Sequence, residues 1–162
     1  LGLKLGDYFN SGMLLMNMKE LRNVHLAEHF LYLLNKYHFD CVAPDQDYLN
    51  SMCYGKIEYL DSCWDAMPNR NKPEIENPKI IHYNLFDKPW CYDDIQYQDY
   101  FWEYAKQSVY YDKIKAYKAA YTDKQKEDDH AHLLDLFRRA GTNADTEVTF
   151  RKVLESGEKV RL

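Results

Sequence analysis

The feature that most constrains the fold is a change of pattern near Gln96. Before it, three short segments have the apolar character of buried strands, residues 12–17, 56–60 and 79–83. After it, apolar residues recur at helical spacing to the end of the chain. Three or four strands are too few for a complete doubly wound sheet. The sequence therefore predicts an α/β first part followed by an all-helical tail.

The N-terminal residue is Leu1 rather than a methionine. Together with the shortage of strands, this favours a chain that continues upstream, where the remaining strands would lie. We therefore expect these 162 residues to be part of a longer chain whose upstream residues complete the sheet.

Composition narrows the classes of function. Apolar residues make up 46% of the chain, enough for a folded core. The formal net charge of -5 argues against a nucleic-acid partner, which requires a basic face. No apolar run is longer than five residues, which is far too short to span a membrane. We expect a soluble, cytoplasmic protein, or one attached to the inner face of a membrane.

The four cysteines do not suggest a metal or disulfide framework. They form no C-x-x-C pair, and no Cys/His spacing matches a zinc site. Reduced, partly buried thiols are the expected state.

In the first part of the chain, two helix starts are indicated by local signals. Asn17 followed by Glu20 is typical of a helix N-cap, and the apolar stripe that follows is interrupted near Asn23. Pro44 favours a helix over residues 45–53, ended by Gly55.

In the tail, Gln96 to Tyr121 is expected to form one long helix or two shorter ones. Thr122 and Gln125 form a capping box for a helix that reaches Ala140 and stops at Gly141. A last short helix is expected over residues 145–155.

Three polar segments stand out as candidates for chemistry. Asn10-Ser11-Gly12 lies at a loop-to-strand junction, where a glycine lets backbone approach a ligand and an Asn amide can bind sugar hydroxyls. Asp45-Gln46-Asp47 begins a helix. His82 ends an apolar segment and is followed by Lys88-Pro89-Trp90, where a lysine is well placed for a phosphate.

Each segment also has a structural interpretation. The Asn10–Gly12 turn could simply orient the next segment, and Asp47 is better explained as a helix-capping acid than as a ligand. A lone His at the end of an apolar segment is more often a hydrogen-bonded core residue than a metal ligand. Lys88 could be an ordinary solvated lysine. The residues alone leave these alternatives open.

Three segments carry a family resemblance when they are taken together. They are Tyr8-Phe9-Asn10-Ser11-Gly12-Met13-Leu14-Leu15-Met16-Asn17, Pro44-Asp45-Gln46-Asp47-Tyr48-Leu49-Asn50, and Ile81-His82-Tyr83 with Lys88-Pro89-Trp90. In this order they closely resemble glycosyltransferase family 8. The resemblance covers about Asp7 to Trp90. It implies a partial GT-A-like (nucleotide-diphospho-sugar transferase) fold. On this basis residues 1–95 are expected to be the C-terminal half of the catalytic domain, and residues 96–162 a helical C-terminal extension.

The resemblance also implies roles for single residues. His82 matches a histidine that binds a divalent ion, usually Mn²⁺, whose other ligands are the aspartates of a D-x-D motif upstream of this chain. Asn10, Gly12 and Asp45 match donor-sugar contacts, and Asp45 and Gln46 match the catalytic face. Lys88 matches the lysine that neutralises the leaving diphosphate. Asp45-Gln46-Asp47 is not the metal motif, despite its letters.

One position departs from the family pattern. A glycine usually stands three residues after the histidine, and here that residue is Leu85. A leucine cannot let the backbone approach phosphates as a glycine would. This puts the detailed phosphate contacts of the loop in doubt.

The function implied is a retaining hexosyltransferase that moves galactose or glucose from UDP-galactose or UDP-glucose to a glycan or glycolipid acceptor, as in bacterial lipopolysaccharide synthesis. Because a Gln is a poor nucleophile, same-face attack is favoured over double displacement. The fragment alone is expected to be inactive. The main alternative is a non-catalytic module that binds a glycan or a protein partner, and a glycogenin-like self-glucosylating enzyme is a weaker one.

Two further features carry no site. His130 and His132 lie two residues apart, so on a helix they face different directions and chelate poorly. The Tyr/Lys-rich stretch 97–126 is an alternative membrane-surface contact, but its interspersed acids favour packing within the molecule.

Overall fold

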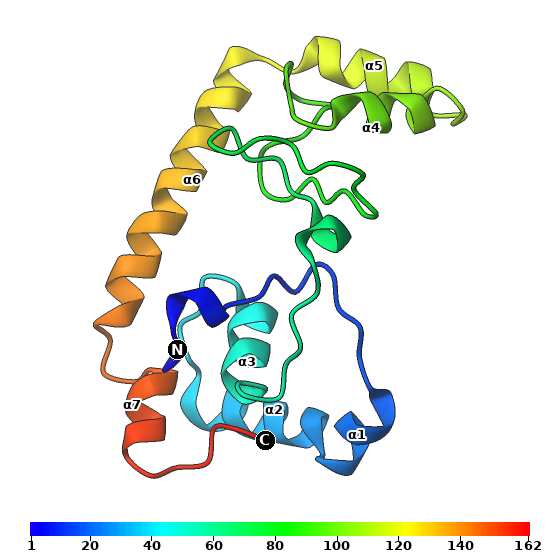
Figure 1. Ribbon diagram of the computed structural model, residues 1–162. Coiled ribbons are helices and arrows are strands. Elements are labelled where there is room, and N and C mark those ends of the chain that lie inside the picture. Colours follow the sequence, from blue (N-terminus) through cyan, green and yellow to red (C-terminus); the bar gives the residue numbers. More distant parts are fainter. The chain divides into compact units, whose positions relative to one another are not determined.

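The computed structural model describes residues 1–162, apart from the side chain of Leu5. Its regular elements are seven α-helices and two short 3-10 helices (Figure 1). The chain forms two compact units, one of Leu1–Tyr59 with Asp135–Leu162 and one of Leu60–Leu134. The units do not follow the predicted division at residue 95, which stays a prediction.

The three predicted strands are not formed. The residues that the structure describes contain no β-strand, and one isolated parallel bridge joins Ala66 to Ile81. In the first predicted strand the side chain of Leu15 is 88% exposed. A strand needs a neighbouring strand for its backbone hydrogen bonds, and only the bridge supplies one here. The α/β class is therefore not confirmed, and the chain is 49% helical.

The first unit contains α1 (Met18–Asn23), α2 (Leu26–Tyr37), α3 (Pro44–Met52), α7 (Phe150–Glu155), the 3-10 helix η1 (Leu5–Asp7) and the end of α6 (Asp123–Ala144). Its core is an apolar cluster from α2, α3, α7 and the segments that follow α2 and α7. It is formed by Leu33, Phe39, Tyr48, Met52, Phe150, Val153 and Val160. The rings of Phe39 and Phe150 stack with centroids 3.8 Å apart. The last residues of the chain therefore share a core with residues far earlier in the sequence.

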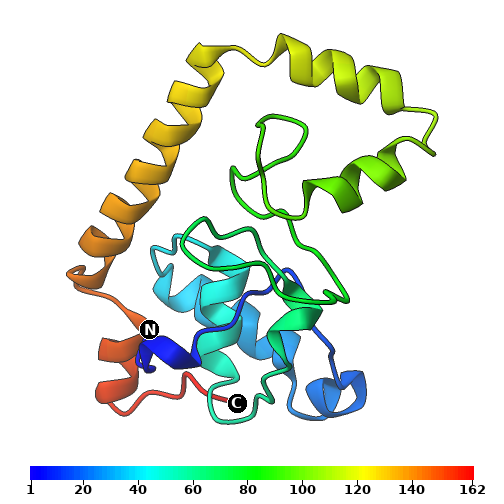
Figure 2. The same cartoon turned by 45° about the horizontal axis from the view of Figure 1, so that its top comes forward.

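The N-terminal segment packs beside α7, as both views show (Figures 1 and 2). Arg161 Nη2 donates to the carbonyl oxygen of Gly2 at 3.0 Å, and the α-carbon of Gly2 faces the backbone of Arg151. The backbone amide of Leu162 donates to the carbonyl of Met52. Both chain ends are thus fixed to the first unit.

The second unit contains the 3-10 helix η2 (Ser62–Asp65), a long irregular segment, α4 (Gln98–Ala105), α5 (Tyr111–Ala120) and the first part of α6. Its buried side chains are Ala66, Pro89, Cys91, Ile95, Tyr97 and Ala105. Prolines and asparagines between residues 66 and 78 explain the irregular segment.

Several predicted helix boundaries are confirmed, but the last helix begins at Phe150 rather than at residue 145. Asn17 caps α1 by accepting from the amide of Glu20, and α1 ends at Asn23. Thr122 and Gln125 form the reciprocal capping box before α6, because each side chain accepts from the other's backbone amide. The predicted stop at Gly141 is wrong: α6 continues to Ala144, since a single glycine in a helix costs only about 1 kcal/mol.

Two further properties bear on the sequence expectations. The four cysteines are free, with Cys91 buried and the other three half-buried. Among the helices that the structure describes, none is long and apolar enough to cross a membrane.

Candidate functional site

The Asn10–Gly12 turn is tied to the start of α3 by two predicted site residues. The backbone amide of Ser11 donates to Gln46 Oε1 at 2.7 Å, and Ser11 Oγ donates to Asp45 Oδ2 at 2.9 Å. The amide of Gly12 donates to Asn10 Oδ1 at 2.7 Å, which closes the turn locally. The first unit therefore brings Asn10, Gly12, Asp45 and Gln46 together.

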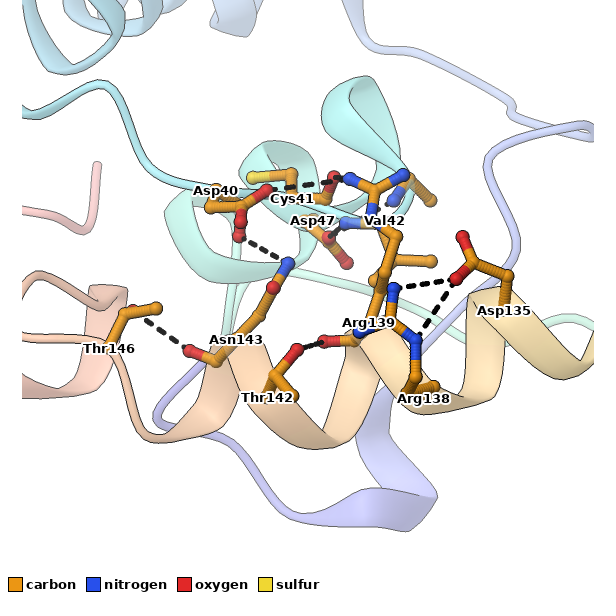
Figure 3. Close-up of polar contacts among 11 residues, drawn as sticks. Asp40, Cys41, Val42, Asp47, Asp135, Arg138, Arg139, Thr142, Asn143 and Thr146 are labelled. Carbon is orange, nitrogen blue, oxygen red and sulfur yellow. Dashed lines mark hydrogen bonds and ion pairs between the residues drawn. The ribbon is translucent and has the colours of Figure 1, made fainter.

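Local sequence explains why α3 begins where it does. Pro44 stands at the first helical position, which needs no backbone donor. Asp47 Oδ2 accepts from the backbone amides of Val42 and Ala43 at 3.2 and 3.3 Å (Figure 3). Asp47 is thus the helix-capping acid predicted, while Asp45 remains exposed on the same turn.

The end of α6 holds the segment that leads into α3. Arg139 Nη2 lies 3.5 Å from Asp40 Oδ1 and 3.4 Å from the carbonyl oxygen of Cys41 (Figure 3). Asn143 Nδ2 donates to the carbonyl oxygen of Asp40 at 3.1 Å. A helix of the predicted tail therefore supports the predicted catalytic turn.

The side-chain amide of Gln46 is held at both ends. Its oxygen accepts from Ser11, and its Nε2 donates to Tyr8 Oη at 2.7 Å. Tyr8 in turn donates to Asp47 Oδ1 at 2.8 Å. Burial raises the pKa of Tyr8 to about 12, so its hydroxyl remains a donor at neutral pH. Gln46 is consequently a fixed, neutral group.

Asn50 joins the same network from the next turn of α3. Its side chain is completely buried and forms a two-way pair with the backbone of Phe9, since Phe9 N donates to Oδ1 and Nδ2 donates to Phe9 O, both at 2.9 Å. Asn50 Nδ2 also donates to the carbonyl of Gln46. This places the segment before the turn against α3.

Asn10 and Asp45 keep polar atoms available. Among the residues that the structure describes, none accepts from the Nδ2 group of Asn10, and none donates to Asp45 Oδ1. An amide donor and an exposed carboxylate oxygen on one turn suit the hydroxyls of a sugar.

His82 is paired with an acid that the sequence did not indicate. The backbone amide of His82 donates to the carbonyl of Ala66, which holds residues 80–82 beside residues 65–66. His82 Nδ1 lies 3.0 Å from Asp65 Oδ1, and the two side chains are 29% and 23% exposed. Because a carboxylate accepts, the neutral imidazole carries its proton on Nδ1, and Nε2 then has its lone pair. That is the tautomer a metal ligand requires.

Lys88 is not an ordinary solvated lysine. Its ammonium donates to the carbonyl oxygen of Tyr83 and lies 5.5 Å from the centroid of the Trp90 ring. Burial lowers the pKa of Lys88 below its usual range. A partly desolvated ammonium interacts more strongly with an anion than one in bulk water.

Leu85, the departure from the family pattern, adopts a left-handed conformation with φ of 42°. This region favours glycine, because a Cβ there approaches the following carbonyl. The side chain of Leu85 is 59% exposed, so packing gives little in return. The backbone at this position therefore has a conformation that favours glycine, although the residue is a leucine.

A cavity of about 440 Å³ lies beside this loop, within the second unit. Its polar lining includes Ser62, Asp65, Asn69, Lys72, Asn84 and Asp87. Leu85 and Phe86 form part of its apolar lining. His82 and Lys88 are neighbours of this cavity in sequence, and Asp65 connects it to His82.

Sequence reasoning missed four residues of these groups: Tyr8, Ser11, Asn50 and Asp65. The first three lie inside the segments that carry the family pattern, so their position beside Asn10 and Gln46 was a usable signal. Asp65 lies 17 residues before its partner, at the end of η2. Nothing local in the sequence marks such a pair.

The described residues hold no group of three or more His, Cys, Asp or Glu side chains that could bind a metal ion. His82 with Asp65 can supply one oriented imidazole. His130 and His132 are exposed on α6. The Tyr/Lys-rich stretch is mixed in character, with Tyr97 5% exposed and Tyr104 72% exposed.

Residues 3–94 match the sequence model of Glycosyl transferase family 8. A Haemophilus influenzae protein whose name assigns it to the glycosyltransferases is 31% identical over 98 residues, 56% of this chain and 30% of its own length. General stress protein A of Bacillus subtilis is 28% identical over 102 residues, 52% of this chain and 36% of its own length.

Lipopolysaccharide 1,2-glucosyltransferase of Escherichia coli is 29% identical over 98 residues, 53% of this chain and 29% of its own length. The chain thus spans about a third of the length of the curated relatives that it matches. No solved structure gives a significant match to it.

Proposed function

The chain belongs to glycosyltransferase family 8, and from this premise we propose that it is the C-terminal part of a retaining hexosyltransferase. The donor would be UDP-galactose or UDP-glucose, and the acceptor a glycan or glycolipid of bacterial lipopolysaccharide or surface polysaccharide. The observation that supports this most directly is the hydrogen-bonded junction of Ser11 with Asp45 and Gln46, inside the matched residues.

In this proposal Asn10, Gly12 and Asp45 contact the donor sugar. Asp45 would accept from sugar hydroxyls through its open oxygen, and Asn10 would donate through its Nδ2 group. Gly12 leaves room for the sugar because it has no side chain. The turn is closed by its own hydrogen bonds, so binding would require little ordering of the protein.

Gln46 would face the anomeric carbon. Glycosyl transfer passes through an oxocarbenium-like state, and an oriented amide oxygen stabilises its positive charge. Contacts with Ser11 and Tyr8 fix this amide. An amide is a poor nucleophile, so the proposal favours attack on the same face as the departing diphosphate.

His82 fits one position of a divalent metal site, because Asp65 leaves its Nε2 lone pair free. The remaining ligands would come from a D-x-D motif outside this chain, and we propose Mn²⁺ as the ion. When bound, such an ion neutralises charge on the leaving diphosphate. Lys88 would contribute an ammonium to the same charge, which its partial burial strengthens.

The protein is proposed to act in the cytoplasm or on the inner face of the membrane. The main alternative is a module that binds glycans without transferring them. The polar atoms of Asn10 and Asp45 would serve either role, whereas the oriented imidazole of His82 favours the catalytic one.

A transfer assay with the complete gene product tests the proposal. UDP-galactose and UDP-glucose are supplied with lipopolysaccharide core and Mn²⁺, and transferred hexose is measured. Gln46→Ala and His82→Ala are expected to lower transfer about 100-fold or more, while His130→Ala, which changes an exposed histidine, has no effect. UDP-sugar binding without transfer in the unmodified protein would favour the binding module. The chain alone, without upstream residues, is expected to be inactive.

A further inference from the structure

The ammonium of Lys118, on α5, is bound by the loop that follows Lys88. Its Nζ donates to the carbonyl oxygen of Pro89 at 2.9 Å and to that of Tyr92 at 2.6 Å. It also lies 2.9 Å from Asp93 Oδ1. Three oxygens therefore match the three donors of one ammonium group, and two of them belong to the backbone of a single turn.

The environment of Lys118 strengthens these bonds. Its side chain is 21% exposed, and its Nζ lies 5.5 Å from the centroid of the Trp102 ring. Hydrogen bonds from a charged donor are about twice as strong as those between neutral groups. The backbone of the turn closes on Lys88 itself, since the amides of Cys91 and Tyr92 both donate to the carbonyl of Lys88. The bonds of Lys118 consequently act on the turn that begins at Lys88.

A second connection runs from the same turn to α6. Tyr92 donates to Asp129 Oδ2 at 2.7 Å, and Tyr121 donates to the same oxygen at 2.6 Å. Burial raises the pKa of Tyr92, and the hydrogen bond to Asp129 raises that of Tyr121. Both phenols thus remain donors at neutral pH, and the connection is intact there.

A third contact comes from α4. The ring of Trp90 packs on that of Phe101 with centroids 4.9 Å apart, and Pro89, which directly precedes Trp90, is fully buried. Residues 89–92 are therefore held by all three helices of the second unit. Lys88, immediately before them, has few possible positions.

We propose that Lys118 is a positioning residue for Lys88: by holding the carbonyls of Pro89 and Tyr92, it keeps the Lys88 ammonium aimed at the diphosphate of the donor. The part of this proposal that concerns the diphosphate rests on the proposed function of Lys88. The helical tail, which the family pattern does not reach, is then a structural part of the diphosphate loop.

The first test measures the loop itself in the 162-residue chain. Lysine acylation followed by mass spectrometry reports how often Lys88 is released from the Tyr83 carbonyl. Lys118→Met removes the ammonium and is expected to raise the acylation rate of Lys88 about tenfold. Lys118→Arg, which keeps charged donors, restores most of the protection. Lys115→Met, on the same helix but over the ring of Tyr111 only, leaves the rate unchanged.

An unchanged acylation rate of Lys88 in a folded Lys118→Met protein would overturn the proposal. If Lys118→Met does not fold, Lys118→Gln keeps one donor near the two carbonyls. A smaller rise in acylation is then expected, and no rise contradicts the proposal.

The second test separates positioning from function and uses UDP binding by the complete gene product. Lys88→Ala and Lys118→Met are expected to weaken binding about equally, and Lys115→Met not at all. If Lys88→Ala weakens binding and Lys118→Met does not, positioning is refuted while the role of Lys88 stands. If Lys88→Ala has no effect, its proposed role fails, and the acylation result alone decides whether Lys118 holds the loop.

Discussion

The two groups of predicted site residues are held in different ways. In the first unit, Asp45 and Gln46 bind the Ser11 turn directly, so the residues of the family pattern hold one another. In the second unit, His82 is held by Asp65, and the turn after Lys88 is held by Lys118. Neither partner lies in the three segments that carry the resemblance, although Asp65 is within the matched residues 3–94. The family segments thus contain both sides of the Ser11 junction, although α6 also supports it through Arg139 and Asn143. At His82 and Lys88 they contain only one side of each contact.

The largest effect is expected where the first group meets the core. Asn50→Ala removes a fully buried amide and leaves the backbone of Phe9 unpaired. The free energy of unfolding should fall by about 3 kcal/mol, measured by urea denaturation. Asn35→Ala, an exposed asparagine on α2, should change it by less than about 0.5 kcal/mol. Equal losses in the two variants would show that the junction is not tied to the core through Asn50.

In the second group, substitution of Asp65 most directly disrupts the contact that orients His82. Asp65→Ala should leave the neutral imidazole of His82 as a mixture of Nδ1–H and Nε2–H tautomers. In the unmodified protein we expect the Nδ1–H tautomer. ¹⁵N NMR of the imidazole distinguishes the two tautomers. If His82 binds a metal, its affinity for Mn²⁺ should fall about 10–100-fold. Asp87→Ala, another acid on the cavity wall, should leave the tautomer unchanged. An unmodified protein with the proton on Nε2 would contradict the assignment.

The loop of the second group, between His82 and Lys88, should be stabilised by a substitution at Leu85. Leu85→Gly relieves a left-handed leucine with an exposed side chain, and we expect about 1 kcal/mol of added stability. Leu85→Ala keeps the Cβ and should give no gain, which makes it the matched control. The measurement is the midpoint of chemical denaturation. Equal midpoints for glycine and alanine would mean that the backbone at this position is not strained.

The smallest expected effect is the pH dependence of the first group. Burial raises the pKa of Tyr8 to about 12 from an ordinary value of 10.0. The unfolded chain therefore loses this proton first, and the contribution of Tyr8 to stability is complete below pH 10 and is lost as pH rises toward 12. By pH 11 the loss should be below about 1 kcal/mol, since the phenol is only half-buried.

Tyr8→Phe should remove that part of the alkaline loss, and Tyr104→Phe, an exposed tyrosine, should not. Denaturation curves at pH 9 and pH 11 give the comparison. Parallel losses in Tyr8→Phe and the unmodified protein would exclude Tyr8 as a source of the alkaline dependence.

Local signals predicted local structure well. The caps at Asn17 and Thr122 and the proline at the start of α3 are confirmed, because each acts within about one turn of helix. The predicted interruption of the first helical pattern near Asn23 is also confirmed, because α1 ends at Asn23 and α2 begins at Leu26. The stop at Gly141 failed because a glycine is a weak signal when the helix around it is otherwise favourable.

The strand predictions depended on partners that no local pattern can supply. Apolar character alone suggested residues 12–17, yet Leu15 is exposed and its backbone is not paired with any described strand. Only at Ile81 does a neighbouring segment form a bridge. A helix satisfies its backbone hydrogen bonds internally, whereas a strand satisfies them with another strand.

The sequence by itself determined the family, the helix caps at Asn17 and Thr122, the start of α3 and the candidates Asn10, Gly12, Asp45, Gln46, His82 and Lys88, because these are recorded in short runs of residues. Tertiary structure decided what surrounds each candidate. The pairs Asp65–His82 and Lys118–Pro89 join residues 17 and 29 positions apart. Such contacts depend on how irregular segments and helices pack, and packing is a property of the folded chain rather than of any one segment.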